Sequence, residues 1–474
     1  MRAINGGSIR FLRAAPLAIA LALAGCALKA PPDHQTLVSD AMPAMKTPAA
    51  WAAPGVAPGV VAGSWLGTFA DARLDALVAE ALTYNTDLRV AAARVERAAA
   101  YAKQAGATLY PQVNAMLRGG GPTSGDGSGL EGGGFYASWE LDLWGRVRSQ
   151  AAAGSAQYEA AQKDAEYARQ SIAALVAKDW FLATEARRQR DIAQEMTAAS
   201  AKLAALARER VRVGSGDEYD VRTAEASVQG YRDMVLQLDL AQQQAIRAIE
   251  TLAGRYPSAA LALAADFPAF PGPVPAGLPS ELLERRLDVA AAERQVASAF
   301  YLVSEAQAAR LPRISLTANV SSISSELFIL KERDNPVWSA GAGIIAPIFM
   351  GGALKAQVEI RTAEQKAAVA NYGSVGARAF SEVENALSAG FNLAERVKVL
   401  EAAVAENDRA LELTRVRYRV GKVDEGAIQQ QMLATAAARS ALTRAVRERF
   451  VQRVNLHLAL GGSFDNTQVA AQSR

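Results

Sequence analysis

The residue with the most specific chemistry in this chain of 474 residues is its one cysteine, Cys26. It completes the tetrapeptide Leu23-Ala24-Gly25-Cys26, which resembles the bacterial lipobox, where small residues suit the signal peptidase and the thiol receives a diacylglyceryl group. Residues 14–23 form an apolar run too short to span a bilayer, and three arginines precede it: Arg2, Arg10 and Arg13. We therefore expect a signal peptide over residues 1–25 and a lipid anchor on Cys26. The alternative is a free or buried thiol beside an ordinary cleavage site.

Other reactive constellations are lacking in the sequence. The two histidines, His34 and His457, are far apart, and nothing resembles a nucleophile–base pair or a cluster of metal ligands. A single cysteine excludes an internal disulfide, and a net charge of +3 does not single out nucleic acid as a partner. We predict no catalytic, cofactor-binding or metal site and no enzyme; the lipid on Cys26 is the one covalent group expected. Ala27 follows the cysteine, so the aspartate of the inner-membrane retention signal is absent, and this predicts the outer membrane.

Large parts of the sequence occur twice, in the same order. Asp87 and Pro111 return as Asp288 and Pro312 at an offset of 201 residues. Further pairs keep the order with little drift, at offsets of 206 and then 207: Gly145 with Gly351, Gly214 with Gly421, and Gly254 with Gly461. This indicates a duplicated unit, with copies over residues 65–256 and 281–462. Two segments rich in Pro, Ala or Gly lie outside the copies: a lipidated N-terminal linker over 26–64 and an equatorial linker over 257–280. A polar tail over 463–474 follows the second copy.

Each copy contains a very long predicted helix. Residues from about 145 to 213 and from about 351 to 420 are rich in strong helix formers and contain no proline. At 1.5 Å per residue, each helix would be roughly 100 Å long. Short heptad patterns indicate coiled-coil packing. Glycines then end the helices, so each copy forms a helical hairpin with its tip at about 213–217 or 420–426.

Alternating segments precede the long helices, at about 112–143 and 313–349. In the second copy, apolar residues 314, 316, 318 and 320 alternate with a polar set: Ser315, Thr317, Asn319 and Ser321. Alternation over about ten residues fits membrane-spanning strands with lipid on one face and water on the other. Half-buried hairpins of a soluble protein show the same pattern. Four strands cannot close a barrel, whereas two chains would supply eight and three would supply twelve.

At this point the sequence resembles the TolC-like family of outer-membrane efflux proteins, in the NodT- or OprM-like lipoprotein subclass of RND systems. The resemblance covers nearly the whole mature chain and is carried by six motifs: residues 81–89, 139–146, 275–280, 285–289, 347–352 and 458–462. It implies a mainly α fold with a small β part. Long helical hairpins would form a trimeric α-barrel, and four strands per chain would form part of a twelve-stranded transmembrane β-barrel.

The resemblance also implies roles at the hairpin tips. In the family, tips that begin with Val-Gly contact the periplasmic adaptor, and two pairs match: Val213-Gly214 and Val420-Gly421. A periplasmic gate is expected among the polar residues nearby: Asp217, Asp220, Asp424, Glu425, Gln430, Arg210 and Arg417. Related proteins often carry Asp where Ala427 and Gln430 stand here, so the acidic gate is in doubt or moves to Asp424. Four arginines would pair with these acids and close the tip: Arg210, Arg212, Arg417 and Arg419. The alternative is that the acids and arginines are solvated charges at helix ends, without a role in gating.

The expected function is a passive exit duct for drugs or other small molecules in a tripartite efflux pump. The expected partners are further copies in a homotrimer, a periplasmic adaptor (membrane fusion protein), an RND-type inner-membrane transporter and outer-membrane lipid, without nucleic acid. Two alternatives remain open: a duct for type I protein secretion, and a periplasmic coiled-coil scaffold lipoprotein without a pore. The exported compounds, the transporter and the resting state of the duct are not encoded in any readable motif.

Overall fold

The computed structural model describes residues 30–61, 63–118, 130–325 and 337–464. The chain divides into two compact units, and each takes segments from both sequence copies. Unit 1 comprises residues 1–45, 93–163 and 290–375; unit 2 comprises residues 46–92, 164–289 and 376–474. The duplication therefore does not produce two independent domains, because each unit is built jointly by the two copies. Among the described helices, none has an apolar run long enough to cross a membrane.

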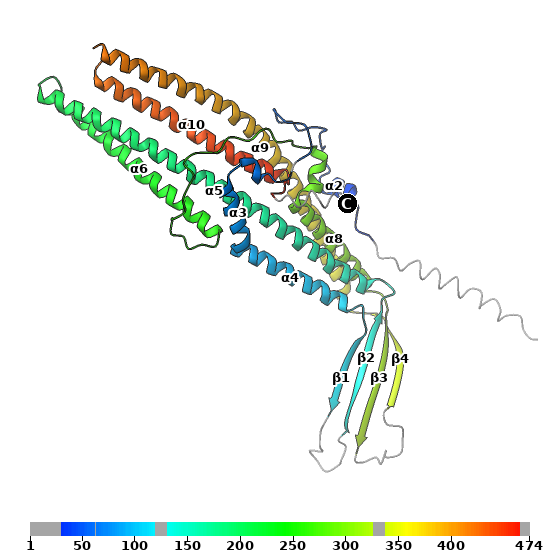
Figure 1. Ribbon diagram of the computed structural model, residues 1–474. Helices are drawn as coiled ribbons and strands as arrows, with labels where there is room; N and C mark the ends of the chain where they lie inside the picture. The colour runs from blue at the N-terminus through cyan, green and yellow to red at the C-terminus, as the bar shows by residue number, and fades with distance from the viewer. Residues whose placement is uncertain (1–29, 62, 119–129, 326–336, 465–474) are drawn as a thin grey trace, which may run out of the picture. The chain divides into compact units, whose positions relative to one another are not determined.

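Unit 1 contains an antiparallel sheet in the order β1-β2-β3-β4 (Figure 1). The strands are β1 Gln112–Arg118, β2 Leu130–Leu141, β3 Arg313–Ser325 and β4 Val337–Ile345. The pairing of β2 with β3 joins the two sequence copies into one sheet. The predicted return strand reached about residue 349, but β4 ends at Ile345. Pro347 lies just beyond that end and has no N–H to offer to a strand ladder, which accounts for the earlier end.

The junction between β2 and the first long helix, α5 (Arg146–Arg212), is held by charged residues of one of the family motifs. Asp142 accepts hydrogen bonds from the backbone N–H groups of Val147 and Arg148, at 3.1 and 2.8 Å. A carboxylate at this place satisfies unpaired N–H groups and the positive end of the helix dipole. Arg146 in turn pairs with Glu140 through two bonds of 2.9 and 2.8 Å. The charged residues of this motif therefore stabilise the connection between the end of β2 and the start of α5.

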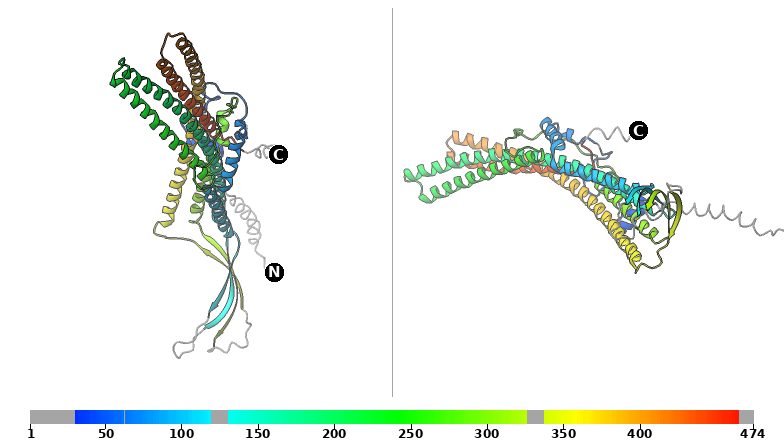
Figure 2. Two further views of the ribbon diagram at one scale, coloured as in Figure 1. Left: turned by 60° about the vertical axis from the view of Figure 1, so that its left-hand side comes forward. Right: turned by 90° about the horizontal axis from the view of Figure 1, so that it is seen from below.

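The helices of the two copies match in length. The long helices α5 and α9 (Ala353–Arg419) have 67 residues each, and the return helices α6 (Glu218–Leu252) and α10 (Glu425–Ala459) have 35 each. Shorter helices α4 (Thr86–Ala107) and α8 (Leu287–Ala308) precede the strands and have 22 residues each. In unit 2, α6 runs back beside α5 and α10 beside α9, as two hairpins (Figure 2). The long and return helices of the two copies begin and end at a constant offset of 207 residues, so the change from 206 at Gly145 and Gly351 falls just before the long helices begin.

The core of unit 2 contains a cluster of aromatic rings. Phe69 ends a 3₁₀ turn (Leu66–Phe69) before α3 (Ala72–Tyr84), and its ring centroid lies 5.2 Å from that of Phe181 on α5. Phe181 stacks on Phe450 of α10 at 4.6 Å. All three side chains are at most 1% exposed. This cluster fastens a long helix of the first copy to the return helix of the second.

The described part of the predicted N-terminal linker makes specific contacts with the rest of the chain. In unit 1, residues 34–41 form helix α2 (His34–Ala41), and His34 lies 3.1 Å from Glu293. In unit 2, the buried Trp51 donates from its indole N–H to the Gly277 carbonyl at 3.1 Å. Glu384 of α9 accepts from the backbone N–H groups of Ala52 and Ala53 at 2.8 and 2.9 Å. Composition rich in Pro and Ala concealed these few specific contacts.

Two other short helical pieces, α7 (Leu282–Arg285) and a 3₁₀ turn (Pro279–Glu281), precede α8.

Candidate functional site

The sheet of unit 1 has one polar and one apolar face. The predicted lumen residues share a face because they alternate along β3, and their neighbours across the ladder are also polar or small: Ser315 pairs with Glu140, Thr317 with Ser138, Asn319 with Tyr136, and Ser321 with Gly134. Ser339 of β4 donates a hydrogen bond to Asn319 at 2.8 Å. The opposite face carries large exposed apolar side chains: Val113, Phe135, Leu316, Trp338 and Ile344. A polar surface and an apolar surface thus lie on opposite sides of one sheet.

The two hairpin tips have the same turn. Gly214 and Gly421 have φ values of +75° and +72°, a left-handed conformation that suits glycine at the end of a helix. The next N–H closes each turn on the carbonyl five residues earlier, from Ser215 to Arg210 and from Lys422 to Arg417, both at 2.8 Å. Val213 and Val420 stand 59% and 63% exposed beside these glycines. The predicted adaptor-contact residues therefore lie at exposed turns of unit 2.

The acidic residues of the tips begin the return helices. Asp217 accepts from the N–H of Asp220 at 3.0 Å and caps α6; Asp424 accepts from the N–H of Ala427 at 3.0 Å and caps α10. Glu425 follows in the first turn of α10, and Gln430 is exposed one turn later. Helix capping explains why an acid stands at 217 and 424, in line with the alternative role of these acids as helix-end charges.

One ion pair joins the two tips. Arg210, near the end of α5, pairs with Asp424 at the start of α10, so the first copy is fastened to the second. Both side chains are about half exposed, at 53% and 56%. Arg212 behaves differently from the expectation: it pairs with Glu209 of its own helix, which lowers the pKa of that carboxyl. Arg417 and Arg419 join no ion pair within the described part of the chain. Arg212 pairs with Glu209 because the two residues lie three positions apart on one helix, a spacing that brings their side chains together.

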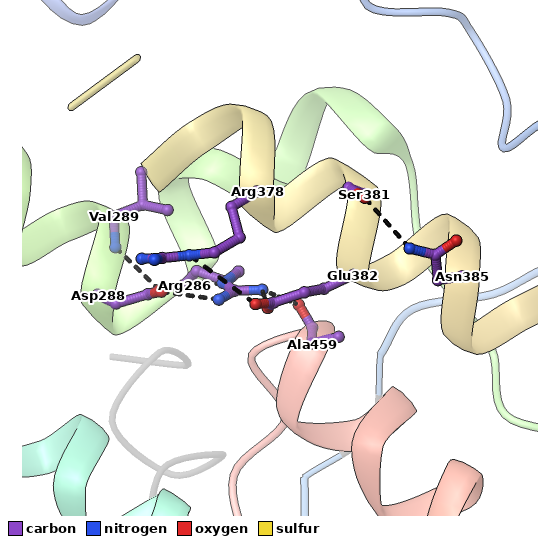
Figure 3. Close-up of polar contacts among 8 residues, drawn as sticks. All are labelled: Arg286, Asp288, Val289, Arg378, Ser381, Glu382, Asn385 and Ala459. Carbon is purple, nitrogen blue, oxygen red and sulfur yellow. Dashed lines mark hydrogen bonds and ion pairs between the residues drawn. The ribbon is translucent and has the colours of Figure 1, made fainter. Parts of the chain in front are cut away.

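A buried charge network at the start of α8 was not assigned a role from the sequence, although Arg286 and Asp288 belong to one of the family motifs. Arg286 is 1% exposed and forms two bonds to Asp288, at 2.9 and 2.7 Å (Figure 3). The same guanidinium donates to Glu382 of α9 at 2.6 Å and to the Ala459 carbonyl at the end of α10 at 3.3 Å. Burial lowers the pKa of Arg286, but its bonds to Asp288 and Glu382 outweigh this and place the pKa above its ordinary value. Arg286 therefore stays charged and joins three helices.

Cys26, the predicted lipid-attachment residue, lies outside the described residues.

Comparison with known proteins identifies a family. The family model described as outer membrane efflux protein matches residues 77–255 and 278–462, which is most of the chain and falls into two blocks, as the duplication does. The cation efflux system protein CusC of Escherichia coli O6:H1 is 29% identical over 465 residues, covering 95% of this chain and 98% of the relative. The pyoverdine export outer membrane protein OpmQ of Pseudomonas aeruginosa is 30% identical over 420 residues, covering 85% and 88%.

Solved structures of outer-membrane channels are also similar to this chain. The outer-membrane channel OprN superposes with a TM-score of 0.78 at 28% identity, covering 89% of this chain and 98% of that one. The predicted fold class is confirmed: mainly α with a small antiparallel β part, arranged as in the solved efflux channels.

Proposed function

Because the chain belongs to the outer membrane efflux protein family, it is an outer-membrane component of an efflux system, and we propose that three copies assemble into the exit duct of a tripartite pump. The duct carries out no chemistry. It passes compounds that an inner-membrane transporter and a periplasmic adaptor deliver. The named relatives export a cation in one case and pyoverdine in another, so we place substrate choice in the partner proteins.

This proposal rests on the unpaired edges and the apolar exposed face of the sheet. Within the described residues, β1 and β4 each pair on one side only, and one face is apolar and exposed. Backbone N–H and C=O groups at a sheet edge find no water in a bilayer, so an open edge is not tolerated there. A ring of three chains would close twelve strands edge to edge, with the face of Thr317 and Asn319 toward an aqueous lumen.

The hairpins support the same assembly. Antiparallel pairs of 67- and 35-residue helices leave many half-exposed side chains that further hairpins would cover. Two matched hairpins per chain give six in a trimer, with approximate sixfold symmetry. The exposed turns at Val213-Gly214 and Val420-Gly421 then form the free end, where we propose that the adaptor docks.

The pair Arg210–Asp424 is the gate element that we propose. It ties the two hairpins of one chain at the tip, so breaking it would let them separate. Asp217, the counterpart of Asp424 in the first copy, caps its helix in the same way. Arg417, the counterpart of Arg210, has no such pair among the described residues, so the tie is asymmetric between the copies.

Assembly and conduction test the function together. We expect full-length protein from outer-membrane fractions to elute as a trimer and to conduct ions in planar bilayers. A monodisperse monomer would refute the duct. A well-folded trimer without conductance would favour the scaffold alternative. Deletion of the gene separates the remaining alternative, since drug sensitivity supports efflux and loss of a secreted protein supports type I secretion.

Lipid attachment has its own test. Growth with labelled palmitate should label the wild-type protein and leave Cys26→Ser unlabelled, because the chain has no other cysteine. Equal labelling of both proteins would exclude Cys26 as the attachment site.

A further inference from the structure

A cavity of about 200 Å³ lies within unit 2, and none of the hairpin-tip residues line it. Four separate segments line it: the N-terminal segment at Pro54, the linker at Phe270 and Pro273, α9 at Leu387 and Phe391, and α10. The approach of the N-terminal segment is close, since a Cβ added at Gly55 would lie 2.7 Å from the Phe391 ring. Most of the wall is therefore apolar and held by tight packing.

Two half-buried arginines on α10, Arg449 and Arg453, supply the charge of this cavity. The guanidinium carbon of Arg449 lies 3.7 Å above the centroid of the Phe270 ring, and that of Arg453 lies 5.8 Å from the same centroid. Arg453 also donates to the Gly272 carbonyl, which occupies one of its five N–H groups, while its buried Nε has no partner. Among the described residues no carboxylate forms an ion pair with either side chain.

Two other arginines of α10 do have carboxylate partners. Arg447, two residues from Arg449, pairs with Glu185 at 2.9 Å, and Arg439 pairs with Asp408 at 2.8 Å. Burial lowers the pKa of Arg449, and the charge of Glu401, which forms no ion pair with it, offsets this only in part. Burial and the neighbouring charge of Arg449 lower the pKa of Arg453 to about 10. Two cations held together against an apolar wall destabilise each other, and an anion between them would relieve both costs.

We propose that this cavity binds an amphiphilic organic anion, with its carboxylate or phosphate between Arg449 and Arg453 and its apolar body against Phe391 and Leu387. Guanidinium groups are suited to such anions because they form paired, charge-assisted hydrogen bonds. The cavity is smaller than pockets that enclose drug-sized ligands, which measure about 300–1,000 Å³. The ligand is therefore a small aryl or alkyl acid, or the acidic end of a longer lipid.

The first experiment uses the full-length protein in nanodiscs of zwitterionic phosphatidylcholine and the soluble probe 4-phenylbutyrate. We expect calorimetric titration to show saturable binding of 4-phenylbutyrate and no binding of its neutral analogue 4-phenylbutanol. The double variant Arg449→Gln/Arg453→Gln should bind at least about tenfold more weakly, because charged hydrogen bonds are the stronger ones. Arg444→Gln is the matched control, since Arg444 is an exposed arginine of the same helix, and it should bind as the wild type does.

The second arm identifies the source of the anion. If the site takes a membrane lipid, adding phosphatidylglycerol to the nanodiscs should weaken apparent 4-phenylbutyrate binding to the wild type; if it takes a free acid, the lipid should have no effect. Three results would overturn the proposal: no binding to the wild type, as when a second copy fills the cavity; equal binding of 4-phenylbutanol; or undiminished binding to the double variant. Thermal unfolding without ligand confirms that each variant is folded, and Arg453→Lys, which keeps the charge, should retain part of the affinity.

Discussion

The two copies solve one structural problem with different chemistry. In the first copy, buried Asn85 donates to the Leu252 carbonyl at the end of α6, at 2.9 Å, and accepts from the N–H groups of Asp87 and Leu88. In the second copy, the equivalent residue is Arg286, which reaches the equivalent carbonyl of Ala459 and needs Asp288 and Glu382 to neutralise it. A neutral amide is self-sufficient at this junction, whereas a buried cation depends on its partners. The comparison teaches that the second copy is the more vulnerable one.

The largest expected effect comes from removing that cation. Arg286→Met should lower the free energy of unfolding by about 3–5 kcal/mol, because Asp288 would lose its counter-charge and Glu382 would keep only its longer pair with Arg378, at 3.9 Å. Asn85→Ala should cost only about 1–2 kcal/mol, for one cap and one buried hydrogen bond. Denaturant unfolding of the full-length protein measures both. Adding Asp288→Asn and Glu382→Gln to Arg286→Met should restore part of the loss; equal losses for the two single variants would break the comparison.

The second prediction concerns a feature that the copies share. Gly254 and Gly461 have φ values of +73° and +70°, and a Cβ would lie 2.9 Å from the Tyr84 carbonyl oxygen in the first copy and 3.1 Å from that of Arg285 in the second. Substitution by alanine should cost about 1–3 kcal/mol at either site, with the larger loss at Gly254, where the contact is shorter. Gly230→Ala is the control, because Gly230 lies in α6 with open space around it and should gain up to about 1 kcal/mol. A neutral Gly254→Ala would show that the turn relaxes.

A third prediction uses a charge that only the first copy contains. Asp179 lies on α5 where α9 has Ala386, and burial raises its pKa from 3.8 to about 6. An acid with a raised folded-state pKa lowers stability as pH rises from about 4 through 6, when the folded protein must give up the proton. Asp179→Asn should therefore match the wild type near pH 4 and exceed it by about 1–2 kcal/mol above pH 7, after allowance for solvent access. Thermal melts across pH measure the difference; a gain that is constant with pH would point to packing instead.

The sequence predicted these elements well because they are periodic or marked by glycine. Equal long helices follow from proline-free stretches of helix formers, and the tips follow from Gly214 and Gly421. The network of Arg286 was not predictable in the same way, since Glu382 lies 96 residues away and no local pattern connects them. Docking of the N-terminal segment depends likewise on single long-range contacts, such as those of Glu384 with Ala52. Local preferences are written in short windows of sequence, whereas partners across the fold are not.

The smallest effect on stability, but a clear effect on function, is expected at the tips. Asp217 and Asp424 are equivalent helix caps, and only Asp424 also pairs with an arginine of the other copy. Asn caps a helix as well as Asp does, so both Asp→Asn variants should change the free energy of unfolding by less than about 1 kcal/mol. Asp424→Asn should nevertheless raise single-channel conductance in planar bilayers, because it releases α10 from Arg210, while Asp217→Asn should leave conductance unchanged. Equal conductance changes in the two variants would show that tip charge, rather than the tie between the copies, controls the opening.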